Sequence, residues 1–104
     1  MSDIVVLFST VPREQSEKIA RDLVERRLAA CVNMCRVVSC FRWEEKVCRE
    51  DEELLIIKTT ENSAAATINR IKEIHPYDIP EIIVLPVVAG HEPYVQWIRS
   101  ETVS

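Results

Sequence analysis

The segment from His75 to Glu81 concentrates polar side chains that could bind a ligand. It contains His75, Tyr77 and Glu81, and Pro76 and Pro80 restrict both their own φ angles and the residues before them. We therefore expect a stiff, extended connector that holds these side chains in place. An imidazole, a phenol and a carboxylate on such a connector suit a binding site, and His75 is the candidate metal ligand among them.

Four cysteines could serve as soft metal ligands or as nucleophiles. Cys31, Cys35, Cys40 and Cys48 contain no C-x-x-C pair, and their spacing relative to the two histidines matches no known metal motif. Three interpretations stay open: structural thiols, a metal site within one chain, or a metal site shared between subunits. A thiol-dependent enzyme or redox protein is the alternative function, although no histidine and carboxylate are paired with a cysteine in the sequence.

The composition excludes several classes of function. One glycine, Gly90, is too few for a dinucleotide fingerprint or a phosphate-binding loop. The net charge of −4 gives no basic footprint, so we expect no nucleic-acid partner. The apolar run from Ile4 to Phe8 is too short for a signal sequence or a membrane span. We therefore expect a cytoplasmic chain with no membrane association.

Three apolar runs predict strands that position these side chains. Residues 4–8 and 54–57 are continuously apolar, as is typical of strands buried on both faces, and the second run continues to Thr60. Residues 82–88 predict a third strand, which Pro86 interrupts. Because proline cannot donate to a strand ladder, we expect the two halves of this strand to have different partners.

The stretch from Ala30 to Trp43 predicts an unusually long strand. Its apolar positions alternate but change phase, which predicts a bulge or bend between Arg36 and Val38. The acidic pair at positions 44 and 45 predicts a turn into a projecting hairpin. A two-residue turn would put Cys40 and Cys48 on opposite faces, and a three-residue turn would put them on one face. Six carboxylates between positions 44 and 53 indicate a solvated surface, with weak attraction of cations as the alternative.

Helical patterns follow two of these strands and end the chain. Apolar residues recur on one face from Pro12 to Leu28, and again from about residue 60 to Ile74. The second helix would be capped by Thr60 or Asn62 and ended by the proline at position 76. A short terminal helix would begin at the proline at position 93 and carry Tyr94, Trp97 and Ile98 on one face.

The resulting order is β-α-β-β-α-β followed by a small helix. This order predicts an α+β, ferredoxin-like sandwich with a long bent second strand, a projecting hairpin and a short C-terminal helix. Residues 1–104 are expected to form a single domain. Two helices can cover only one face of the sheet, so the remaining apolar surface and strand edges predict a homo-oligomer.

These motifs resemble the CutA family of divalent-cation tolerance proteins. The matching motifs are Thr10-Val11-Pro12, Leu28-Ala29-Ala30-Cys31-Val32-Asn33, Ser39, Trp43, Lys58-Thr59, His75-Pro76-Tyr77, Pro80-Glu81-Ile82-Ile83, Leu85-Pro86-Val87, Tyr94 and Trp97. The resemblance implies a homotrimer, similar to PII signalling proteins, that binds or senses a ligand and has no established enzymatic activity. It also implies a link to copper or another divalent cation, with no cofactor assigned.

Three departures from the family pattern bear on the site. Glu45 stands where the family usually has a glycine, and Cys35 stands where a proline is frequent. Some members offer metal ligands through a cysteine at the position of Ser9 and a histidine pair ending at position 75. This chain has Ser9 and Ile74-His75, so only His75 carries over as a metal ligand.

The aromatic residues predict a ligand pocket at a subunit junction. Its predicted members are Cys31, Trp43, Lys58, Tyr77, Glu81, Tyr94 and Trp97. Aromatic walls with one lysine and one glutamate suit a small charged molecule. The alternative is that both tryptophans pack in subunit contacts, where such residues are enriched.

Overall fold

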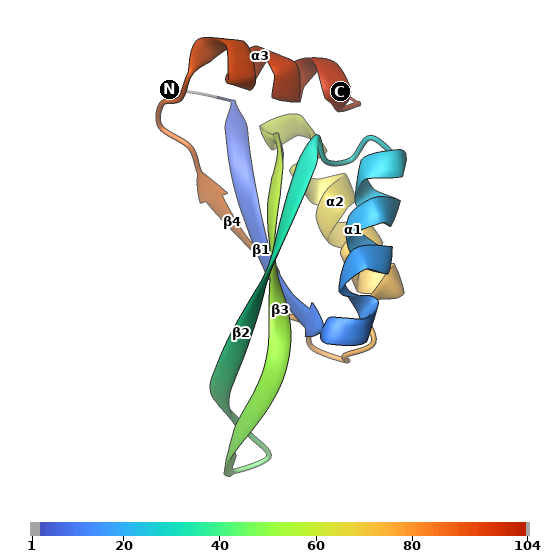
Figure 1. The fold of residues 1–104 in the computed structure, drawn as a ribbon, viewed down its shortest axis with the longest axis vertical. Coiled ribbons are helices and arrows are strands. Elements are labelled where there is room, and N and C mark those ends of the chain that lie inside the picture. The colour runs from blue at the N-terminus through green and yellow to red at the C-terminus, as the bar shows by residue number, and fades with distance from the viewer. Residues whose placement is uncertain (1–2, 104) are drawn as a thin grey trace.

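The computed structural model describes residues 3–103 and confirms the ferredoxin-like prediction (Figure 1). Its elements are β1 (Ile4–Pro12), a 3-10 turn η1 (Arg13–Gln15), α1 (Ser16–Glu25), β2 (Cys31–Trp43), β3 (Lys46–Thr60), α2 (Glu61–Ile74), β4 (Ile83–Pro86) and α3 (Glu92–Glu101). The sheet has the strand order β2-β3-β1-β4, and every neighbouring pair is antiparallel. Helices α1 and α2 lie on one face of the sheet, and α3 crosses one end of it.

The core lies between the sheet and these two helices. Successive strand residues point to opposite faces, so the odd-numbered residues of β1 and β3 point toward the helices. The buried apolar cluster contains Val5, Leu7, Val11, Ile19, Leu23, Ala29, Leu55, Ile57 and Ile71. The even-numbered neighbours Val6, Phe8, Leu54 and Ile56 are only half-buried. These central strands are therefore covered on one face, whereas the apolar runs predicted burial on both.

A second apolar cluster joins α3 to the sheet. Val95 and Ile98 pack with Ile4 and Ala30 at the end of the sheet where β1 and β2 begin. The helix has a proline in its first turn, as predicted. Its outer face carries Tyr94 and Trp97, whose exposed rings stack with centroids 5.6 Å apart.

The first helix is shorter than predicted at both ends. β1 does not end at Phe8, because its second half pairs with β3 as far as the pair Pro12–Glu52. Helix α1 stops before Leu28, because Arg27 adopts a left-handed φ of 60° that cannot continue a helix. In contrast, α2 agrees with the prediction, with Thr60 as the cap that accepts the backbone N–H of Ser63.

Of the bulge or bend predicted for the long strand, the structure contains no bulge. The ladder between β2 and β3 is unbroken from the pair Cys31–Lys58 to the pair Trp43–Lys46. Beyond Cys35 most residues of β2 are exposed, so neither face of the strand has to stay apolar. The apolar residues can therefore change from even to odd positions without the extra residue that a bulge would insert. The hairpin bends through a continuous twist and projects well past the helices (Figure 1).

The hairpin closes through the shorter of the two predicted turns. Glu44 and Glu45 have φ angles of 50° and 65°, as in the two-residue turns that match the twist of a hairpin. Cys48 therefore pairs with Phe41, and Cys40 pairs with Arg49. Because paired residues share a face and neighbours along a strand alternate, Cys40 and Cys48 lie on opposite faces.

The last strand is shorter than predicted. β4 ends at Pro86, and only the N–H of Val87 continues the pairing, to the carbonyl of Ile4 at 3.1 Å. Val88 is 78% exposed and belongs to no strand, so the second half of the predicted strand has no ladder partner within residues 3–103. Within the same residues, no helix has both the length and the apolar character that a membrane span requires.

Candidate functional site

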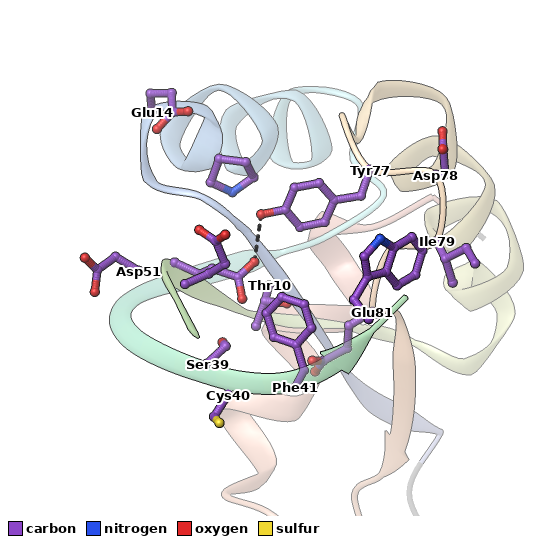
Figure 2. Close-up of a pocket in the computed structure, with 14 residues that line it drawn as sticks. Thr10, Glu14, Ser39, Cys40, Phe41, Asp51, Tyr77, Asp78, Ile79 and Glu81 are labelled. Atoms are coloured by element: carbon purple, nitrogen blue, oxygen red, sulfur yellow. Dashed lines mark hydrogen bonds between the residues drawn. The ribbon is translucent and has the colours of Figure 1, made fainter. Parts of the chain in front are cut away.

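A groove of about 900 Å³ lies between the hairpin and the connector that follows α2 (Figure 2). We call it the acidic groove. Three aromatic residues line it, Phe41, Trp43 and Tyr77. Six acidic residues also line it, namely Glu14, Glu50, Asp51, Glu52, Asp78 and Glu81. Tyr77 enters the groove from the connector, and Phe41 enters it from the hairpin on the opposite side.

The strand period and the twist of the hairpin position the groove residues. Phe41 and Trp43 lie two residues apart on β2, so they share a face of the hairpin. Glu50 and Glu52 lie on the same face of β3, because Glu50 pairs with Ser39. This is the sheet face turned away from α1 and α2. The groove exists because the connector lies against this face and supplies Tyr77.

A buried carboxylate and a phenol meet inside the groove. The Tyr77 hydroxyl donates a hydrogen bond of 2.9 Å to Oε2 of Glu52, which is only 4% exposed. Burial raises the pKa of Tyr77 to about 12, and the acceptor Glu52 and the nearby charges of Glu50 and Glu14 add to the shift. The Tyr77 phenol therefore stays protonated and acts as a donor across the neutral pH range.

His75 holds the connector in place. It caps the C-terminus of α2 and is buried. Its Nδ1 accepts the backbone N–H of Tyr77 at 3.1 Å, so Nε2 carries the proton and donates to the carbonyl of Thr10 at 2.8 Å. The imidazole ring also packs against the Tyr77 ring, with centroids 4.8 Å apart. Both ring nitrogens are thus engaged in fixing the connector.

The described residues of one chain do not fit a metal site. No three side chains of histidine, cysteine, aspartate or glutamate converge as ligands anywhere in residues 3–103. A metal bound at His75 would have to replace the hydrogen bond to Tyr77 or the one to Thr10. All four cysteines are free thiols, and neither nitrogen of His75 contacts one of them.

The predicted pocket residues fall into two groups within one chain. Trp43, Tyr77 and Glu81 line the acidic groove. Cys31 and Lys58 form the first pair of the hairpin ladder, at the opposite end of β2. Twelve strand steps separate the two ends of β2, which is roughly 40 Å at about 3.3 Å per residue. We call the distant group the α3 cluster.

The α3 cluster joins Cys31 and Lys58 to the terminal helix. Burial raises the pKa of Tyr94, and the neighbouring Cys31 thiol adds to the shift. Trp97 stacks on Tyr94. This cluster therefore presents two half-exposed aromatic rings beside a thiol.

Sequence reasoning missed Phe41, Glu50 and Glu52 as groove residues. The sequence did contain a pattern that points to these residues, because a two-residue turn after Trp43 places all three on the face that carries that tryptophan. The pattern could not identify them alone, since the three-residue turn that was also predicted would have moved the β3 residues to the other face. The contact with Tyr77 depends on tertiary packing of the connector, which no local pattern encodes.

Comparison with known proteins decides the family. The model of the CutA1 divalent ion tolerance protein family matches residues 4–101. The chain belongs to this family. It is 41% identical to the divalent-cation tolerance protein CutA of Thermus thermophilus, an alignment that covers 98% of this chain and 99% of the relative. It is also 41% identical to the human protein CutA, but spans only 55% of that relative's length.

Solved structures of CutA proteins share the whole fold. CutA from Xylella fastidiosa superposes with a TM-score of 0.95 at 40% identity, and the comparison covers 98% of this chain and 100% of that one. A PII-like protein CutA from Nostoc superposes with a TM-score of 0.92 at 36% identity, covering 95% and 97% of the two chains. The family prediction made from the motifs is thus confirmed, and these relatives are named for tolerance or for PII likeness, not for a reaction.

Proposed function

We propose that this CutA chain is the subunit of a homotrimer that binds a small charged ligand and acts in sensing, without catalysis. The acidic groove carries the proposal, because it combines volume, aromatic walls and a buried, hydrogen-bonded carboxylate. No thiol is paired with an imidazole, which leaves the alternative of a thiol-dependent enzyme without support in residues 3–103.

The uncovered face of the sheet supports self-association. The even-numbered residues of β1 and β3 point away from the helices, and Val6, Phe8 and Ile56 are among them. The hairpin adds exposed Phe41, and both outer strands of the sheet, β2 and β4, have free edges within the chain. Apolar surface and free strand edges of this kind are normally covered, and further copies of the chain would cover them.

A subunit junction would join the two groups of predicted pocket residues. The acidic groove and the α3 cluster are too far apart to form one pocket within a chain. Trp43, Tyr77 and Glu81 of one subunit could therefore meet Cys31 and Lys58, with Tyr94 and Trp97, only as residues of a neighbouring subunit. In this proposal the trimer completes the binding site and also stabilises each chain.

The subunit arrangement can be tested by light scattering on the reduced protein. We expect a mass three times that of one chain, which is 12.0 kDa. Ile56→Lys puts a charge on the uncovered sheet face and should shift the trimer to monomers. Val24→Lys is the matched control, because Val24 is exposed on α1, on the helix side. A monomeric wild type, or dissociation of both variants alike, would contradict the proposal.

The proposal links this function to tolerance of a divalent cation, as the names of the relatives suggest, and takes copper as the candidate that the family resemblance implies. An ion would need ligands from more than one chain, since none converge within residues 3–103. Equilibrium dialysis of the reduced trimer with Cu(I) or Zn(II) tests this link. Stoichiometric binding that His75→Ala abolishes would assign His75 as a ligand, and binding unchanged by that substitution would remove it.

The proposal also places the chain in the cytoplasm. Four free cysteines suit a reducing compartment, where thiols persist. Other members are described as chloroplastic in Arabidopsis thaliana and periplasmic in Archaeoglobus fulgidus, so the family occupies several compartments. Fractionation of source cells, followed by detection of the protein, tests the assignment, and recovery outside the cytoplasm would contradict it.

A further inference from the structure

We propose that the acidic groove binds an organic polycation of the aliphatic polyamine class. The proposal rests on the proposed function, because it names the ligand class of the same site. It does not require catalysis or a metal. Three independent features of the groove support it: its uncompensated charge, its buried carboxylate and its aromatic walls.

The charge of the groove is largely uncompensated among residues 3–103. No lysine, arginine or histidine lines it, whereas six carboxylates do. Asp51 lies near Arg13 and Arg49, at 3.8 and 3.6 Å. The other five carboxylates form no ion pair with any residue from 3 to 103. Carboxylates gathered in a concave site raise the local concentration of cations, and this attraction grows with the charge of the ligand.

Glu52 points to a cation independently of the other carboxylates. It is 96% buried, since only 4% of its surface is exposed, and its hydrogen-bond partner among the described residues is the neutral hydroxyl of Tyr77. Buried carboxylates are normally paired with a positive group, because an uncompensated buried charge costs several kcal/mol. A cation bound in the groove would supply the missing counter-charge.

The aromatic residues favour an organic cation over a metal ion. Phe41, Trp43 and Tyr77 are each about 40% exposed in the chain. Aromatic faces attract ammonium groups, and the methylene segments between those groups pack on the same rings. A divalent metal gains nothing from these rings and requires converging ligands, which residues 3–103 do not offer.

The size and shape of the groove favour an elongated ligand. Its volume of about 900 Å³ is at the upper end of ordinary small-molecule pockets and far exceeds the space that a bare ion fills. Glu14 and Asp51 lie toward one end of the groove, and Asp78 and Ile79 lie toward the other (Figure 2). A chain with amines at intervals can reach carboxylates at both ends, whereas a single ammonium cannot.

The α3 cluster contributes one cation, Lys58, to the proposed junction. In this junction Lys58 would balance one of the five unpaired carboxylates, and a ligand with several amines would balance the others.

Isothermal titration calorimetry of the reduced full-length protein with spermidine tests the proposal. We expect one spermidine per chain, with an affinity that falls as ionic strength rises. Glu52→Gln should weaken binding about 10-fold, and it keeps an oxygen that can accept the Tyr77 hydrogen bond. Trp43→Leu should weaken binding by a similar factor through the lost cation–π contact. Glu101→Gln changes an exposed carboxylate of α3 and should leave the affinity unchanged.

Two controls separate this outcome from other forms of binding. The neutral chain molecule 1,8-octanediol should not bind, and excess Mg²⁺ should compete no better than its ionic strength predicts. Spermidine binding that both Glu52→Gln and Trp43→Leu leave unchanged, or that Mg²⁺ displaces stoichiometrically, would overturn the proposal. Absence of spermidine binding would overturn it as well.

Light scattering on the calorimetry samples distinguishes failure of this inference from failure of the proposed function. A trimer that does not bind spermidine overturns the polyamine assignment and leaves the trimeric binding protein standing. A monomer overturns the proposed function itself. A trimer that binds spermidine with the expected variant pattern supports both.

Discussion

Tyr77 is the residue that holds the candidate site together. Its backbone N–H fixes the tautomer of His75, its ring packs on that imidazole, and its hydroxyl donates to Glu52 across the groove. His75 therefore acts on the site through the position of Tyr77. The metal-ligand role predicted for His75 stays a prediction that depends on a second chain.

The phenol of Tyr77 should titrate well above the ordinary tyrosine range. Its pKa is raised to about 12, chiefly by burial and then by Glu52. Because the folded pKa exceeds the unfolded value of about 10, the associated stability is complete below pH 10 and is lost as the pH rises toward 12. The chain has two tyrosines, so Tyr94→Phe leaves Tyr77 as the only phenol to follow by ultraviolet absorbance.

The same variant in denaturant provides the control for this titration. We expect a midpoint near 10 in the unfolded chain. A folded-state midpoint that equals the unfolded one would contradict the buried contact between Tyr77 and Glu52. Replacing that glutamate by glutamine should lower the folded midpoint, because a neutral acceptor disfavours the phenolate less than a carboxylate does.

At the scale of elements, one ion pair joins the two helices beneath the sheet. Arg70 of α2 donates two hydrogen bonds of 2.8 Å to Asp22 of α1, and both side chains are less than a quarter exposed. These hydrogen bonds from Arg70, with a further one from Arg26, hold the pKa of Asp22 below its usual value. The stability of this pair is therefore present above pH 4 and is lost as acid protonates the carboxyl.

Asp22→Asn should lower the free energy of unfolding by about 1–2 kcal/mol at neutral pH. Urea unfolding at one fixed protein concentration measures the change. The variant should also lose less stability than wild type on acidification, because its side chain cannot be protonated. Glu25→Gln breaks only the exposed pair with Arg21 and should cost less than about 0.5 kcal/mol. Equal costs for the two variants would contradict a special role for the helix pair.

The hairpin turn carries strain that a substitution can relieve. Glu44 and Glu45 both adopt positive φ angles, which cost about 1 kcal/mol or more for residues other than glycine and asparagine. Glu44→Asn with Glu45→Gly should therefore stabilise the turn by about 1–2 kcal/mol. Hydrogen exchange at the ladder pair Trp43–Lys46 should slow accordingly. Faster exchange in the double variant would contradict the two-residue turn.

The order and type of the elements could be predicted, because each rests on a local pattern. The alternation of apolar residues predicted the sheet, and Thr60 and Pro76 marked the ends of α2. Errors arose where long-range pairing decides the outcome. β3 extended β1 past Phe8, and exposure of both hairpin faces removed the need for a bulge near Val38.

The site was predicted less completely than the fold, for a related reason. Tyr77 and Glu81 were chosen as candidates because prolines mark a stiff connector, and Trp43 because it is one of the few aromatic residues; all three line the acidic groove. Glu52 was missed because its burial comes from the packing of the connector on the hairpin. A single chain also separates residues that the aromatic pattern predicted as one pocket at a subunit junction.

At the scale of the whole molecule, a single chain leaves apolar surface and strand edges uncovered. Its sheet has one uncovered face, its hairpin projects well past the helices, and its predicted pocket is divided between the two ends of β2 (Figure 1). Each of these features is explained if other copies of the chain cover the sheet and complete the groove. Trimer formation is therefore the claim on which the account of ligand binding depends.

A native mass spectrum of the freshly isolated, reduced protein tests this claim most directly, because it reports the number of subunits and any retained ligand together. We predict a dominant species of three chains of 12.0 kDa each, with the added mass of bound small molecules lost on mild activation. A dominant monomer across the working range of protein concentration would contradict the account.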